Sequence, residues 1–553
     1  MACKRGDTTV TTDVVTSGRG PGQQRLLIVV MCAAALIAAA CSSTSGHAAP
    51  ASTGSTAGGT ASSVVVSQAA TVVRIGEDLS GTGSSEPPLF DPTLSHTPAV
   101  QDPWLLGIYG SLLRATNAGG YVPDLATSAT ITDPQTVDLQ IRENVTFSDG
   151  SPFDAAAVRS GILRNRDAKQ LGGFQAVLQD VSAIDVVDPH SLRIHLSQPR
   201  AGSFYDLLAQ SDTFITAPTA AADPSHDLNK APVGAGPYLL KSYDPNQRIV
   251  LTKNPRYWDA KDIHVAEVDF ISVSAGPAQV NTLESGAVDV TAVPFDVVGT
   301  LQANKSFTVG QDFSQTQSLW LPVCKANAPF SDVRVRQALS YAIDRNAINA
   351  AVLHGTGQPQ WALWPRGSAY FPAALDGSYA YNPTKAKQLL SDAGLASGFK
   401  TSIVVAAANP VEQQTAQVLQ AEWKQIGVDL TIVPSTNFVA DFYVRKVAPI
   451  GMNPEVRGGL TAINGPFRSG SVGDACNYDN SSLDSIADQL SLQTPGSSAA
   501  ISLWNQAQSF VVSNALAMWI AYVPYVFASD HHVASVDFLS AYPLPVPNYW
   551  TMS

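Results

Sequence analysis

Apolar and polar residues alternate at period two along several stretches of the first half of the chain. The clearest stretch is TVDLQIRENVTF (136–147), which is followed by the turn sequence SDGSP. Such alternation places every second side chain on one face and predicts a half-buried strand. We expect further strands at 71–76 and 265–273, and hairpins at 181–197 and 238–254 around the turns DPHS and DPNQ. This half is therefore expected to be rich in β-sheet.

From residue 331 the apolar residues recur at helical spacing. The stretch 331–355 places six apolar residues on one side of a single predicted helix, with Ser331 as N-cap and Gly355 at its end. These are Val335, Ala338, Leu339, Ala342, Ile343 and Ile348. On its polar side, Arg334, Arg336 and Asp344 are expected to be solvated or salt-bridged.

Other helices are predicted on both sides of this change of period. A helix is predicted at 154–166, with Asp154 at its N-terminus, where the helix dipole favours an acid. Four more helices are predicted at 384–393, 412–426, 481–490 and 499–516. The strands TSIVVAA (401–407) and VDLTIVP (428–434) flank helix 412–426, which predicts a β-α-β unit. The C-terminal half is therefore expected to be a mixed α/β domain.

The most apolar stretch, Leu26 to Ala40, follows Lys4, Arg5, Arg19 and Arg25. A helix over it would cover about 22 Å, which is short of a bilayer core of about 30 Å. Basic residues, an apolar run and small residues in this order are typical of a secretory signal, here 1–40. Cys41 directly after three alanines resembles the bacterial lipobox, in which the cysteine is acylated, although alanine replaces the usual leucine. An Ala-x-Ala cut, a retained helix and a downstream start codon are the alternatives.

Residues 41–70 are dominated by Ser, Thr, Gly and Ala and carry no charged side chain, so we expect a flexible linker. The remainder is too long for one core and should divide into two or three domains. The whole chain has a net charge of −12 and no basic run, which argues against a nucleic-acid partner. Its 45% hydrophobic and 14% charged residues indicate a folded protein.

Cysteine is rare in this chain. Cys3 and Cys32 would leave with the signal, and Cys41 would carry lipid, which leaves Cys324 and Cys476. Outside the cytoplasm two remaining thiols favour a disulfide between them, with two separate buried thiols as the alternative. No motif for zinc, a nucleophile elbow or a phosphate-binding loop is present, so we expect no catalytic residue, metal or cofactor. His531 and His532 are adjacent, which would point them apart in a strand, so we reject them as a metal pair.

Six stretches together resemble the family 5 solute-binding proteins of ABC importers, the dipeptide-, oligopeptide- and nickel-binding group. Each stretch alone is weak evidence, but the set occurs in the family's order and spans residues 71–553. The stretches are YVPDLATSATITDPQTVDLQIRENVTFSDGSPFDAAAV (121–158), GAGPYLL (234–240), LTKNPRYW (251–258), DVRVRQALSYAIDRNAI (332–348), YNPTKAKQLLSDAG (381–394) and LQAEWKQIGVDLTI (419–432).

This resemblance implies an α/β fold of two lobes, like that of periplasmic binding proteins, with mixed sheets flanked by helices and a hinge between the lobes. Lobe I would comprise 71–108, 232–305 and 525–553, with an inserted subdomain at 109–231. Lobe II would comprise 306–524. Because the chain would cross between lobes twice, the lobes could close over a ligand.

The resemblance also implies where a ligand would lie. The contacts expected in the cleft come from the loop after the first strand, from three tryptophans and from the segment RGGLTAING. These residues are Leu89, Phe90, Trp320, Trp361, Trp364, Arg457, Gly459, Leu460, Thr461 and Asn464. Aromatic side chains offer a large rigid contact area at low entropy cost, although burial in the core is an equally good explanation of each tryptophan. For Arg457 a surface role is an alternative to contact with an anionic ligand group.

Two departures from the family pattern concern the ligand. Peptide-binding members have an aspartate for the peptide's ammonium group, but no acid occurs from Gly458 to Arg468, and Leu460 replaces an aromatic residue. Dipeptide-binding members have arginines for the carboxylate, and 406–417 contains none. Since burying an unpaired ammonium group is costly, an ordinary dipeptide is disfavoured. Longer peptides, blocked or modified peptides and other solutes stay open.

The sequence thus predicts a lipid-anchored receptor at the outer face of the cytoplasmic membrane. Its expected partners are a peptide or peptide-like solute and an ABC permease with its ATPase subunits, and its membrane contact would be through lipid only. We expect a monomer that is not an enzyme. An anchored sensor or adhesin of the same fold is the first alternative, and a secreted hydrolase is the second.

Overall fold

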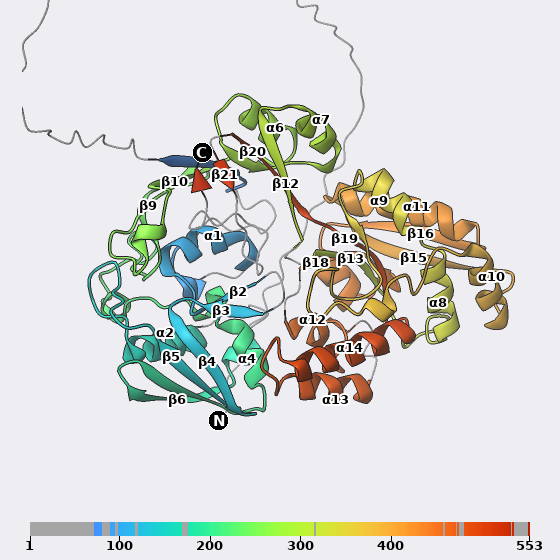
Figure 1. Ribbon diagram of the computed structural model, residues 1–553. Helices are drawn as coiled ribbons and strands as arrows, with labels where there is room; N and C mark the ends of the chain where they lie inside the picture. The colour runs from blue at the N-terminus through green and yellow to red at the C-terminus, as the bar shows by residue number, and fades with distance from the viewer. Residues whose placement is uncertain are drawn as a thin grey trace, which may run out of the picture. The chain divides into compact units, whose positions relative to one another are not determined.

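The computed structural model describes residues 71–79, 89–94, 98–116, 120–168, 175–313, 317–456, 459–471, 473–474, 480–531, 533–535 and 551–552 (Figure 1). Leu26–Ala40, Cys41 and the 41–70 linker lie outside these residues. Ser67–Ser553 form one compact unit that combines helices with mixed sheets. Within the described residues, every helix is too short or too polar to cross a bilayer.

A seven-stranded sheet with the order β12-β20-β11-β1-β10-β9-β8 brings together strands that are far apart in the sequence. Its centre is β1 (Val72–Glu77), which runs parallel to β10 (Glu267–Ser272) and β11 (Val290–Ala292). The other strands are β8 (Tyr238–Asp244), β9 (Arg248–Lys253), β12 (Phe307–Asp312) and β20 (Tyr525–Asp530). The predicted first strand and the 238–254 hairpin are confirmed.

Two apolar clusters pack against opposite faces of this sheet. Phe270 lies in one cluster and its neighbour Ile271 packs against the other, because successive side chains of a strand point to opposite faces. The first cluster includes Trp104 and Tyr109 of α1 (Pro98–Tyr109). The second includes residues of α6 (Pro277–Glu284) and α7 (Val298–Ala303). The sheet is thus covered on both faces.

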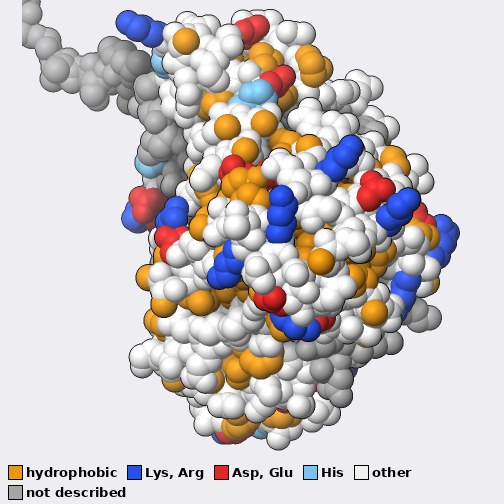
Figure 2. Space-filling model, turned by 90° about the vertical axis from the view of Figure 1, so that its right-hand side faces the viewer, with side chains coloured by type: hydrophobic (Ala, Val, Ile, Leu, Met, Phe, Trp, Pro, Cys, Tyr) orange, Lys and Arg blue, Asp and Glu red, His pale blue; other side chains and the backbone are white. Residues whose placement is uncertain are grey.

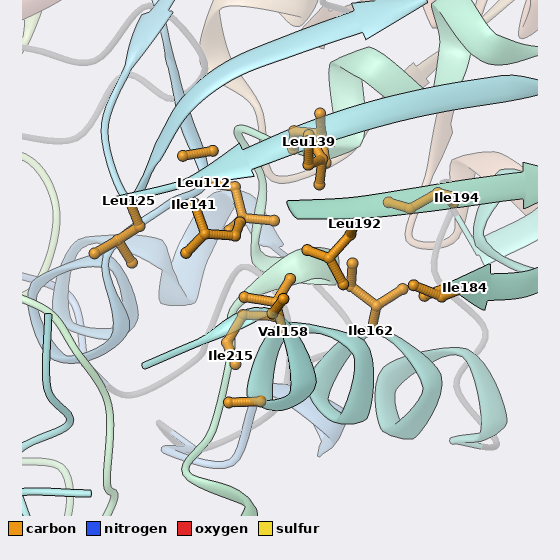
Figure 3. Close-up of a cluster of buried hydrophobic side chains, with 14 of the residues drawn as sticks. Leu112, Leu125, Leu139, Ile141, Val158, Ile162, Ile184, Leu192, Ile194 and Ile215 are labelled. Carbon is orange, nitrogen blue, oxygen red and sulfur yellow. The ribbon is translucent and has the colours of Figure 1, made fainter. Parts of the chain in front are cut away.

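A four-stranded antiparallel sheet with the order β4-β5-β7-β6 forms a second core (Figure 3). Its strands are β4 (Ala126–Asp133), β5 (Thr136–Ile141), β6 (Val181–Asp188) and β7 (Ser191–Leu196). Leu139 and Leu192 of the sheet belong to the same cluster as Val158 and Ile162 of α2 (Ala155–Asp167). The predicted 181–197 hairpin is confirmed.

The boundaries of two predicted elements in this core can be compared with the structure. Asp154 is the N-cap of α2, and its side chain accepts a hydrogen bond from the Ala157 N–H, as the helix prediction requires. The predicted strand 136–147 is too long. It ends at Ile141, and the chain turns at Asn144, whose φ is 60°.

A third set of elements forms the C-terminal α/β part. β15 (Phe399–Ala406) and β16 (Val428–Ser435) run parallel and are joined by α11 (Pro410–Lys424), which confirms the predicted β-α-β unit. A second sheet has the order β14-β19-β13-β18. Its strands are β13 (Gln317–Pro322), β14 (Gln358–Pro359), β18 (Asn453–Val456) and β19 (Ala517–Tyr522). The predicted helices occur as α10 (Pro383–Asp392), α13 (Ser481–Leu490) and α14 (Ser498–Ser513).

The prediction of one helix over 331–355 is wrong. The structure has two helices there, α8 (Val333–Tyr341) and α9 (Arg345–Val352), and Asp332 rather than Ser331 caps the first. Asp344 separates them because its side chain accepts a hydrogen bond from the Ala347 N–H and so starts a new helix. The six apolar residues expected on one side are nevertheless all buried.

Two neighbouring connections join the seven-stranded sheet to the sheet of β13 and β19. The chain leaves β12 for β13 and returns from β19 to β20, while β12 pairs with β20 and β13 with β19. β12 belongs by pairing to the seven-stranded sheet, and the lobe boundary expected at residue 306 stays a prediction. We call the residues on the β12 and β20 side, with the inserted sheet, the first region, and those on the β13 and β19 side the second region.

Candidate functional site

The carboxyl end of β1 lies next to the connections between the two regions. In open α/β sheets ligands bind beyond the carboxyl ends of the strands, so this edge is a candidate site. Leu89, half-buried, and Phe90, buried, belong to the loop that follows β1. The Phe90 N–H donates to Asn229 Oδ1 at 2.9 Å, and its ring lies edge-on to Tyr243 at 5.2 Å. Phe90 thus anchors this loop to the first region.

Glu77, the last residue of β1, is an acidic group at this edge that the motif comparison did not single out. It is half-buried, and the loss of solvent raises the pKa of its carboxyl to about 7. Burial raises the pKa of Tyr525, the first residue of β20, and the nearby Glu77 carboxylate raises it further. An acid near neutral pKa beside the connections can receive a cationic or hydrogen-bonding ligand group.

The three tryptophans expected in the cleft differ in their environment. Trp320 and Trp364 are buried, with exposed fractions of 3% and 7%, in one apolar cluster of the second region. The Trp320 ring centre lies 5.5 Å from that of Trp519, and the Trp364 ring centre lies 5.2 Å from that of Trp504. Trp361 is half-buried, and the Arg345 guanidinium lies 4.5 Å from its ring centre. Contact of these side chains with a ligand stays a prediction.

The segment after residue 458 carries the other expected contacts. Gly459 has a φ of 53°, Leu460 is buried, and α12 (Thr461–Asn464) is a single short turn of helix. Asn464 is half-buried. Arg457 lies outside the described residues, so its expected role is a prediction only.

A buried carboxylate contacts this segment from a distant part of the chain. Asp206 of α4 (Ala201–Leu207) accepts hydrogen bonds from the Leu460 N–H at 3.0 Å and from the Tyr121 hydroxyl at 2.6 Å. Burial raises the pKa of Asp206 to about 6. The absence of an acid from Gly458 to Arg468 therefore does not leave this segment without one. No local signal in the stretch GSFYDLL identifies Asp206, because its partners are distant in sequence.

A buried ion pair joins Asp474, close to the same segment, to Lys325 in the loop that follows β13. Lys325 Nζ lies 3.8 Å from Asp474 Oδ1, and both side chains are almost completely buried. Burial lowers the pKa of Lys325 to about 8, although the Asp474 carboxylate opposes this shift. The adjacent Cys324 is disulfide-bonded. Cys476 lies outside the described residues, so the Cys324–Cys476 pairing stays a prediction.

Two arginines of the second region are structural. The expectation that Arg336 is solvated or salt-bridged is wrong, since it is buried and donates to the carbonyls of Phe330, Asn514 and Ala515. Arg345 is also buried and donates to the carbonyls of Gln360, Trp519 and Tyr379 among others. Arg334 pairs with Asp332, as expected for a surface residue.

The described residues contain no group of three or more His, Cys, Asp or Glu side chains placed to hold a metal ion. His531 Nε2 lies against the Lys305 carbonyl, and His532 is outside the described residues. On the face shown in Figure 2, basic side chains are interspersed with acidic and hydrophobic ones.

A comparison with known families decides the relationship of this chain. The model of the bacterial extracellular solute-binding proteins, family 5 Middle, matches residues 120–448. The chain belongs to this family. Its likeness to the dipeptide-, oligopeptide- and nickel-binding group is thereby confirmed.

Individual relatives agree with this assignment. The glutathione-binding protein GsiB of Salmonella paratyphi A is 28% identical over 310 residues, which are 56% of this chain and 60% of GsiB. The chain thus spans about three fifths of the length of the curated relatives that it matches. The substrate-binding protein CtaP of Listeria monocytogenes has a TM-score of 0.74 at 20% identity, covering 87% of this chain and 99% of CtaP.

A third relative was solved with a ligand. DppA of Helicobacter pylori, in complex with the peptide STSA, has a TM-score of 0.68 at 20% identity, covering 87% of this chain and 97% of DppA. These structures establish the two-lobed fold of periplasmic binding proteins for this family member. Family 5 proteins bind peptides or related solutes for ABC importers, and the named relatives are binding proteins rather than enzymes.

Proposed function

We propose that this chain is the solute receptor of an ABC importer, held at the outer face of the cytoplasmic membrane by lipid on Cys41. It captures a peptide or peptide-like solute between its two regions and delivers it to a permease and its ATPase subunits. In this proposal the chain acts as a monomer and has no catalytic role and no cofactor.

One structural observation carries this proposal. The first and second regions have their own apolar clusters, with Phe295 of the first region also packing against the main cluster of the second. Two neighbouring connections join the regions, from β12 to β13 and from β19 to β20. Such an arrangement allows one region to rotate against the other with few backbone changes. In this proposal, Glu77 in the first region and the 459–464 segment in the second supply polar groups to the solute. The relatives' named ligands, glutathione for GsiB and a peptide for DppA, support the peptide-like class.

A ligand screen tests the solute class. Native mass spectrometry of the purified full chain should detect a co-purified solute of peptide-like mass. Thermal unfolding should then be measured with free peptides, N-acetylated peptides, glutathione, amino-acid conjugates, sugars and metal chelates. A ligand at 100 times its Kd stabilises the folded state by about 2.7 kcal/mol, which is readily detected. The proposal fails if none of these compounds raises the unfolding temperature.

The lipid anchor and the delivery step need their own measurements. A Cys41→Ser chain should appear in the medium, and the native chain should carry the added mass of acyl groups. If the native chain is membrane-bound with an unmodified Cys41, the anchor is wrong. Loss of solute uptake after deletion of the gene would distinguish an importer from a sensor or adhesin.

A further inference from the structure

Hydrogen bonds join α4 to the second region at a place away from the two connections. The Gly202 N–H donates to the Ser491 carbonyl at 2.6 Å, and Ser491 Oγ donates to the Pro199 carbonyl at 2.9 Å. The third is the bond from the Leu460 N–H to Asp206. These bonds link two separate apolar clusters, since Phe204 of α4 packs in the first region and Leu490 in the second.

The first bond uses a group that a helix leaves without a partner. Gly202 is the second residue of α4, and the first four N–H groups of a helix have no acceptor within the helix. In this structure the Ser491 carbonyl, which follows α13, is that acceptor. Water can take its place when the regions separate, so the contact is reversible without leaving a buried polar group unsatisfied.

Glycine is required at two points of this contact. A Cβ atom on Gly202 would lie 2.7 Å from the Ser491 carbonyl oxygen, and one on Gly459 would lie 2.0 Å from Asp206 Oδ2. Both distances are shorter than van der Waals contact allows. Gly202 therefore meets the backbone of Ser491, and Gly459 meets the Asp206 carboxylate, at distances that a larger side chain at either position would prevent.

We propose that Pro199, Gly202 and Asp206 form a clasp with Leu460 and Ser491 that holds the two regions closed without help from the solute. This inference rests on the proposed function, because it assumes that the two regions separate to admit a solute. The clasp sets the fraction of closed protein before binding and so scales the apparent affinity for every solute.

A matched pair of glycine variants tests the clasp. Gly202→Ala places a methyl group against Ser491 in the closed form only, and alanine favours the helix itself. Gly299→Ala is the control, because Gly299 is also the second residue of a helix, α7, and no atom lies within 4 Å of its added Cβ. Neither glycine has a positive φ, so neither substitution strains the backbone.

The readout is the distance between the regions in the absence of solute. Fluorophores attached through unnatural amino acids at Val187 and Val444, whose side chains are 64% and 71% exposed, report this distance by single-molecule energy transfer. Gly202→Ala should lower the ratio of closed to open molecules more than tenfold, while Gly299→Ala leaves it at the wild-type value. An unchanged ratio in Gly202→Ala would overturn the clasp.

A milder variant keeps the test decisive if Gly202→Ala folds poorly. Ser491→Ala removes the hydroxyl that bonds to the Pro199 carbonyl and, within the second region, to the Asp488 carbonyl. Since only the bond to Pro199 crosses between the regions, the variant should lower the same ratio about two- to tenfold, the effect of one net hydrogen bond. If Ser491→Ala reduces unfolding stability but leaves the distance distribution as in wild type, the contact belongs to a fixed fold. Because this readout needs no solute, its failure together with successful ligand capture would reject the clasp and leave the proposed function intact.

Discussion

The β-α-β unit and the 459–474 segment belong to the same region and both pack in apolar clusters, but the segment also depends on polar groups from distant parts of the chain. In the unit, Trp423 and Leu419 of α11 are buried against strands that are close in sequence. In the 459–474 segment, Leu460, Ile463 and Phe467 are buried in an apolar cluster. In addition, Asp206 accepts a hydrogen bond from the Leu460 N–H, and Lys325 forms an ion pair with Asp474. Apolar packing thus stabilises both parts, and distant polar groups add to it in the segment that carries predicted ligand contacts.

The largest expected effect concerns the apolar scaffold. Trp423→Ala removes a fully buried ring from the main cluster of the second region, and we expect a loss of about 3–5 kcal/mol in unfolding free energy. Urea unfolding of the full chain measures it. The control is Lys424→Ala at the exposed neighbouring position, which should change the free energy by less than about 0.5 kcal/mol. A similar value for both variants would contradict the assignment of stability to apolar packing.

The next largest effect concerns the ion pair between Lys325 and Asp474 at the 459–474 segment. Lys325→Met removes the cation beside the buried Asp474 carboxylate, and we expect a loss of about 3 kcal/mol. Proteolysis after Arg468 should also become faster, because the segment loses its ion pair with the loop that follows β13. The double variant Lys325→Met with Asp474→Leu removes both charges and should recover most of the stability. If the single variant is as stable as wild type, the ion pair does not hold the segment.

The smallest expected effect concerns a polar group within the β-α-β unit. Helix α11 carries the buried acid Glu422. Burial raises the pKa of Glu422 from 4.5 to about 7, so the folded state favours the protonated form. Its contribution is therefore most favourable below about pH 4.5 and is lost as the pH rises to about 7. We expect wild type to lose about 2 kcal/mol relative to Glu422→Gln over this interval. The unfolding free energy of both proteins should be measured in urea at each pH. If it changes with pH by the same amount in both, Glu422 does not cause the pH dependence.

Much of the fold follows from local sequence. The strand patterns, the Asp154 cap and the β-α-β unit were predictable because each depends on neighbouring residues or on a period of two or 3.6. The helix over 331–355 failed for a local reason, since Asp344 competes with helix continuation by capping the next helix. The candidate site was less predictable. Its aromatic residues could be named from the family pattern, but their burial could not.

The sequence by itself determined the family, the order of secondary structure and the apolar cores, because these depend on short-range patterns and ordered motifs. Only the tertiary structure decided that Asp206 accepts a hydrogen bond from the Leu460 N–H, 254 positions away, and that the Gly202 N–H donates to the Ser491 carbonyl. A hydrogen bond between distant residues has no periodic signal in the chain, since its partners are brought together only by the packing of separate cores. The same reasoning explains why Arg336, charged and on a predicted polar face, is buried against distant carbonyls.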